Sequence, residues 1–116
     1  MTLVGHVRAA FMAALFFAGM QIAQATDSIG GALSIAKQNA CLGCHAVNKK
    51  IVGPSFRDVA AKYKSNPSAN IFLKNKIQKG GAGSWGVVPM PANAKLSDAE
   101  LSLLVFWILQ GAPDNN

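Results

Sequence analysis

The motif Cys41-Leu42-Gly43-Cys44-His45 constrains this chain more than any other feature, because it holds the chain's only two cysteines. Residues three and four positions apart share one face of a helical turn, so both thiols and the imidazole can meet one flat group. Cys-x-x-Cys-His is the attachment motif of c-type haem. The sequence therefore predicts one haem c, bound covalently through Cys41 and Cys44, with His45 as an iron ligand.

Two other functions of a Cys-x-x-Cys pair are weaker alternatives. A structural zinc site needs four ligands, and the chain has no second cluster of cysteine and histidine to complete one. A thiol-disulfide redox motif belongs in a pattern of alternating strands and helices, which is missing here, and it gives no role to His45.

The N-terminal segment, residues 1–25, has the pattern of a secretory signal peptide. A cationic start with Arg8 precedes an apolar run over residues 9–18, and small residues stand at Ala23 and Ala25. We expect cleavage before Thr26, export to the periplasm, and a single mature domain over residues 26–116.

An uncleaved membrane anchor is the alternative for this segment. The apolar run is shorter than the ~20 residues that span a bilayer, and Gly19 and Gln21 interrupt it soon afterwards. We therefore expect no stable membrane insertion after cleavage.

Cleavage also simplifies the choice of iron ligands. The chain has two histidines and four methionines, and His6, Met1, Met12 and Met20 all precede the expected cut. The mature chain then keeps one histidine, His45, and one methionine, Met90. Histidine and methionine are a common axial pair, in which the thioether raises the reduction potential.

Met90 could instead be a side chain that fills a gap in the core, as most buried methionines are. Its setting favours a ligand, because Pro89 and Pro91 flank it. Two prolines make a stiff, extended segment that can hold a sulfur atom in place without a helix.

The hydrophobic periodicity and the capping signals predict an all-α domain. Four helical segments are expected, and no alternating strand pattern is present. The first has apolar residues from Ile29 to Ala40, and the second starts at a capping pair of Ser55 with Asp58 and runs to about Tyr63. The third starts at Asn66-Pro67 and stops at Gly80, and the fourth, residues 98–110, starts at a capping box of Ser97 with Glu100.

Several motifs in the same order resemble the small bacterial class I cytochromes c, the cytochrome c-551/c-552 group. These are Cys41 to His45, Gly53-Pro54, Trp85-Gly86 and Pro89-Met90-Pro91 with Asn93. The resemblance implies the class I cytochrome c fold, with about four helices wrapped around one covalently bound haem. It also implies that the first and last helices cross beside the haem.

The resemblance assigns further haem-binding roles. The Pro54 carbonyl would accept a hydrogen bond from His45, which fixes the tautomer of a ligating histidine. Trp85 would donate its indole N–H to a haem propionate, or pack against the porphyrin. Asn93 would hydrogen-bond toward the Met90 sulfur. Lys76 stands where family members often have an arginine, and a lysine cannot form the same bidentate contact.

Charge and family together predict the partners. Of eleven lysines and arginines, Arg8 leaves with the signal segment, so ten face five acidic residues in the mature chain. The lysines are spread along the sequence rather than clustered, which argues against nucleic-acid binding. The net positive charge predicts redox partners with acidic docking surfaces. The resemblance implies a quinol-oxidising complex as electron donor and an oxidase, nitrite reductase or peroxidase as acceptor.

The sequence thus predicts a soluble, monomeric periplasmic carrier of single electrons that converts no substrate. One alternative is a haem protein whose sixth iron position opens to a gas or peroxide, although no second histidine remains to act as its acid or base. Another is a haem subunit of a larger membrane complex. The last helix is apolar nearly all round, which raises the possibility of an associating surface.

Overall fold

The structure is a computed structural model that describes residues 20–114. Within them lie four α-helices and one short 3₁₀ turn. They are α2 (Met20–Gln38), η1 (Cys41–Gly43), α3 (Phe56–Tyr63), α4 (Ala69–Lys79) and α5 (Asp98–Leu109). The described residues form isolated β-bridges but no β-strand. The predicted all-α fold is therefore confirmed.

Two helices begin where their capping signals predict. The Ser55 side chain accepts a hydrogen bond from the Asp58 N–H at the start of α3. At the start of α5, Ser97 and Glu100 form a complete capping box, in which each side chain bonds the other residue's backbone N–H. Local side-chain chemistry satisfies backbone donors that a helix leaves unpaired.

The predicted start of α4 is wrong by two residues. The helix begins at Ala69, after an N-cap at Ser68, rather than with Pro67 in its first turn. The Asn66 side-chain oxygen instead accepts a hydrogen bond from the Ser68 N–H at 2.8 Å. Asparagine readily caps such a turn, and here the turn competes successfully with helix initiation.

Helix α2 ends earlier than the spacing of its apolar residues predicts. The helical periodicity of these residues continues to Ala40, but the helix stops at Gln38. Ala40 then adopts a left-handed conformation with φ of 56°. This residue redirects the chain, and the Cys41–Gly43 turn follows immediately.

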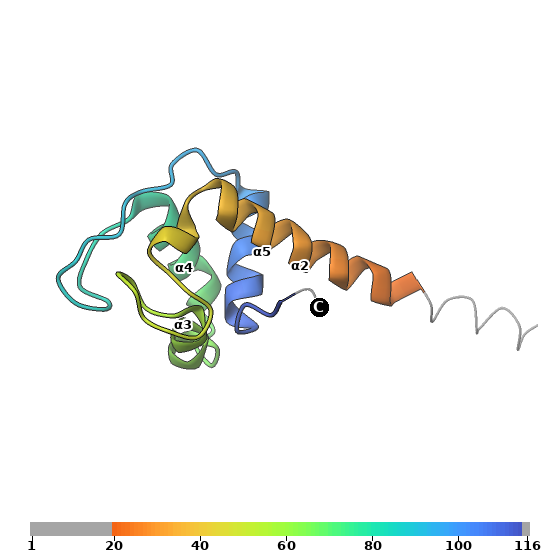
Figure 1. Cartoon of the computed structure of the whole chain (residues 1–116), viewed down its shortest axis with the longest axis horizontal. Helices are drawn as coiled ribbons and strands as arrows, with labels where there is room; N and C mark the ends of the chain where they lie inside the picture. The colour runs from red at the N-terminus through yellow and green to blue at the C-terminus, as the bar shows by residue number, and fades with distance from the viewer. Residues whose placement is uncertain (1–19, 115–116) are drawn as a thin grey trace, which may run out of the picture.

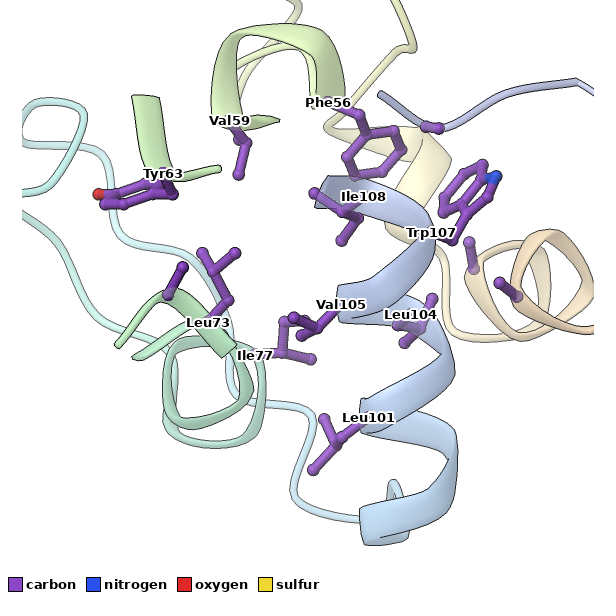
Figure 2. Packing of buried hydrophobic residues seen from close by; sticks show 14 of the residues in the cluster. Phe56, Val59, Tyr63, Leu73, Ile77, Leu101, Leu104, Val105, Trp107 and Ile108 are labelled. Atoms are coloured by element: carbon purple, nitrogen blue, oxygen red, sulfur yellow. The ribbon is translucent and has the colours of Figure 1, made fainter. Parts of the chain in front are cut away.

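Helix α5 is the centre of the domain. It packs against α2, α3 and α4 (Figure 1). Figure 2 shows α5 directing Leu101, Leu104 and Ile108 toward the other helices. Three packed sides explain why this helix is apolar nearly all round, since one buried face would need only a stripe.

Residues 1–19 of the expected signal segment lie outside the described residues, and α2 runs through the expected cleavage position. The cleavage therefore stays a prediction. Among the helices of the described residues, none is both long and apolar enough to span a membrane.

Candidate functional site

A mainly apolar cavity of about 240 Å³ lies between the helices and loops of the described domain. Helices α3, α4 and α5 supply one wall, through Val59, Tyr63, Leu73, Leu104 and Ile108 among others. Figure 2 shows Val59 of α3 and Leu73 of α4 pointing toward each other across the space between these helices. The Cys-x-x-Cys-His segment and the segment that contains Met90 also line the cavity.

A single turn of backbone brings the three chemical groups of the motif to this cavity. The N–H groups of Cys44 and His45 both donate to the Cys41 carbonyl, at 3.2 and 2.9 Å. The turn is the one that the motif predicts, with residues three and four apart on one side. Cys41, Cys44 and His45 all line the cavity.

The two thiols are available for covalent chemistry. Both cysteines are free, and both are half-buried. Burial raises the pKa of the Cys41 thiol, with the neighbouring Cys44 a smaller contribution in the same direction. No group of three or more possible metal ligands of the histidine, cysteine and carboxylate types occurs in the described part of the chain.

The His45 imidazole is oriented by Pro54. Its Nδ1 atom lies 2.7 Å from the Pro54 carbonyl oxygen. A carbonyl can only accept, so in the neutral imidazole Nδ1 carries the proton and Nε2 has the free lone pair. The resemblance predicted this hydrogen bond, and the resulting tautomer is the one that a metal ligand requires.

Two further residues lie against the imidazole, and sequence reasoning missed both of these contacts. The Phe56 ring stacks on it, with centroids 5.3 Å apart and an interplanar angle of 22°. At Gly53, a Cβ atom would come within 2.5 Å of the His45 Cε1 atom. Phe56 resembles any apolar core position in the sequence, and Gly53 resembles an ordinary turn glycine.

Met90 enters the cavity from a loop that is fastened at its two ends. Gly81 and Met90 exchange two backbone hydrogen bonds, each of 2.9 Å. The Met90 side chain is half-buried and packs against the hydrophobic core. The predicted second ligand therefore lines the same cavity as His45, although 45 positions separate them in the sequence.

Trp85 lines the mouth of the cavity and is 42% exposed. The Lys62 ammonium lies 4.4 Å from the centroid of the Trp85 ring. The same ammonium donates a hydrogen bond of 2.8 Å to the Ser84 carbonyl. Lys62 thus connects α3 to the glycine-rich loop, and the sequence carries no local signal for this contact.

Asn93 lies beside the site without lining the cavity. Its side-chain nitrogen is 3.5 Å from the Pro91 carbonyl, and its backbone N–H donates to the Ile77 carbonyl at 2.9 Å. Its predicted bond toward the Met90 sulfur stays a prediction. Lys76 lines the cavity, but its role toward a propionate likewise stays untested.

The residues present suit a flat, apolar, iron-containing group. Two free thiols, one imidazole with an available lone pair and one thioether share a single apolar hollow. Soft sulfur and imidazole are known haem ligands, whereas a hydrated ion would find few oxygen ligands here.

Comparisons with known proteins agree with this donor set. The family model described as cytochrome c matches residues 32–112. The chain is 47% identical over 75 residues to cytochrome c-552 of Nitrosomonas europaea, covering 65% of this chain and 73% of that protein. It is also 47% identical over 77 residues to cytochrome c-551 of Allochromatium vinosum, covering 66% of this chain and 82% of that protein.

The chain is also similar to solved structures of cytochromes. The crystal structure of wild-type Nitrosomonas europaea cytochrome c552 matches with a TM-score of 0.65 and 44% identity, covering 68% of this chain and 98% of the other. The class 1 cytochrome MtoD from Sideroxydans lithotrophicus matches with a TM-score of 0.64 and 30% identity, covering 73% and 97% respectively.

Proposed function

Because the chain belongs to the cytochrome c family, whose members are electron-transfer proteins carrying covalent haem c, we propose that it is a soluble periplasmic shuttle for single electrons. The observation that carries the proposal is the convergence of Cys41, Cys44, His45 and Met90 on one apolar cavity. The bound haem supplies the chemistry, which is reversible one-electron reduction of its iron.

Each residue of the site has a proposed task. Cys41 and Cys44 would hold the haem covalently through their sulfur atoms. His45 presents Nε2 to the metal while Pro54 retains the proton on Nδ1. Met90 would supply the second ligand of the iron, and a thioether ligand would favour the reduced state. The apolar wall of α3, α4 and α5 excludes water, so little solvent reorganises when the charge changes.

The partners follow from charge. Lys50, Lys62 and Lys76 lie at or beside the cavity, and the mature chain would carry an excess of five positive charges if residues 1–25 are removed. Basic groups around a redox centre accelerate the encounter with an acidic partner while the complex stays short-lived. We propose a quinol-oxidising complex as donor and an oxidase, nitrite reductase or peroxidase as acceptor.

Absorption spectra test the ligand assignment. The purified protein is measured oxidised and reduced, with and without carbon monoxide, beside a Met90→Ala variant. A sulfur-to-iron band in the oxidised wild type, lost in Met90→Ala, and carbon monoxide binding by the variant alone would support the carrier. Rapid carbon monoxide binding by the wild type would contradict it and favour a haem protein with an open sixth position.

Mass spectrometry tests the proposed processing. Protein recovered from the periplasmic fraction should have the mass of residues 26–116 plus one haem. Recovery of the full-length chain in the membrane fraction would contradict both cleavage and the soluble state. Stable copurification with a membrane complex would favour the alternative of a haem subunit.

A further inference from the structure

The hydrogen bond to Pro54 restrains the His45 ring at one atom only. It holds Nδ1 2.7 Å from the Pro54 carbonyl oxygen. One such contact is soft, so the ring can still make small rotations about its Cα–Cβ and Cβ–Cγ bonds. A second contact, against the face of the ring, is needed to hold its orientation.

Phe56 provides that contact. Its ring lies nearly parallel to the imidazole, at 22° and with centroids 5.3 Å apart. Phe56 is only 4% exposed, so it cannot swing away into solvent. Gly53 lies against the same imidazole, where even a Cβ atom would collide with Cε1 and Nδ1. Together these neighbours leave the ring little room to rotate.

The support for Phe56 comes from the last helix. Phe56 packs against Trp107, with ring centroids 5.2 Å apart and an interplanar angle of 60°. Figure 2 shows the two rings side by side. The Trp107 indole N–H donates a 3.0 Å hydrogen bond to the Pro113 carbonyl, in the turn that follows α5. A continuous series of contacts therefore joins the C-terminal turn to the imidazole.

We propose that Phe56 is a positioning residue that sets the plane of the His45 imidazole, backed by Trp107 and the C-terminal turn. The proposal rests on the proposed role of His45 as an iron ligand. The plane of an axial imidazole determines which iron d orbital holds the unpaired electron of the oxidised, low-spin state. Its orientation is therefore visible in magnetic spectra independently of electron-transfer activity.

The test compares haem-loaded variants by electron paramagnetic resonance and by the proton shifts of the haem methyl groups. Phe56→Leu keeps an apolar side chain and removes the flat face, so the g values and the spread of the methyl shifts should change. Phe56→Tyr keeps the ring and should retain the wild-type pattern. Phe56→Met repeats the loss of the flat face if the leucine variant fails to load haem.

Leu101→Ala is the matched control for lost stability, because Leu101 is buried in the core but does not line the cavity. It should lower the unfolding free energy and leave the magnetic pattern unchanged. A wild-type pattern in both Phe56→Leu and Phe56→Met, or an equal change in Leu101→Ala, would overturn the proposal. Failure of the ligand assignment is separate, since it would appear in the wild-type protein as a missing sulfur-to-iron band.

Discussion

Gly81 and Met90 pair as a two-residue β-bridge, each donating a 2.9 Å hydrogen bond to the other's carbonyl. The bridge closes the glycine-rich loop and delivers Met90 to the cavity. Gly80 makes this close approach possible, since it has a φ of 69° and packs against the backbone of Met90 and Ala92. A side chain at Gly80 would overlap the Met90 carbonyl oxygen.

We therefore expect Gly80→Ala to weaken the Met90 contact. The left-handed backbone alone costs about 1 to 3 kcal/mol for a residue with a Cβ atom, and the collision adds to that cost. Urea unfolding should show lower stability, and the sulfur-to-iron band should weaken. The control is Gly31→Ala in α2, where a Cβ atom would have no neighbour within 4 Å. That change should stabilise the helix by about 0.5 to 1 kcal/mol, and an equal loss in both variants would contradict the argument.

Lys62 should restrain the loop that carries Trp85. Its ammonium bonds the Ser84 carbonyl and lies over the Trp85 ring. Lys62→Met removes both contacts, and an exposed cation–π contact contributes about 0.5 to 1 kcal/mol. Amide hydrogen exchange in residues 83–86 should accelerate while exchange in α5 stays unchanged. Lys49→Met, a change of an exposed lysine in another loop, should leave both regions unaffected. Equal exchange rates in the two variants would show that Lys62 does not restrain the loop.

The capping box of α5 predicts a pH dependence. Hydrogen bonds from the Ser97 backbone and hydroxyl lower the pKa of Glu100. A lowered folded-state pKa gives stability that is present above the unfolded value of about 4.3 and is lost as pH falls through the folded-state value. The unfolding free energies of wild type and Glu100→Gln should therefore converge only at acidic pH. A wild-type advantage over Glu100→Gln that is constant with pH would contradict the assignment.

The sequence was most informative where structure depends on neighbouring residues. Ser55 and Ser97 begin their helices as predicted, because an N-cap acts within three positions. The predicted start of α4 was wrong because Asn66 can cap a turn as easily as a helix. Only the surrounding structure decides between these two conformations. Local chemistry therefore determined the starts of α3 and α5, but it was ambiguous at Asn66.

The candidate site was predictable for a different reason. His45 and Met90 stood out because the expected mature chain has no other residue of either type. The contacts of Phe56 with His45 and of Lys62 with Trp85 join separate segments, so no spacing rule could indicate them. Residue type thus identified the candidate ligands, whereas the groups that orient them became visible only in the folded chain.

Two neighbours on α5 should differ sharply in their contribution to stability. Phe106 is 54% exposed, whereas Trp107 is 1% exposed and contacts Phe56. Phe106→Ser should change the unfolding free energy by no more than about 0.5 kcal/mol, since serine and phenylalanine have similar helix propensities. Trp107→Ala should cost about 3 to 5 kcal/mol, because it empties a large buried volume.

Phe106 also tests whether the apolar last helix associates with other molecules. Its packing against three helices already accounts for most of its apolar surface, so we expect the wild type to sediment as a monomer at rising concentration. Phe106→Ser should then sediment identically. A wild-type mass that increases with concentration and returns to the monomer value in Phe106→Ser would show instead that the exposed Phe106 side of α5 is an associating surface.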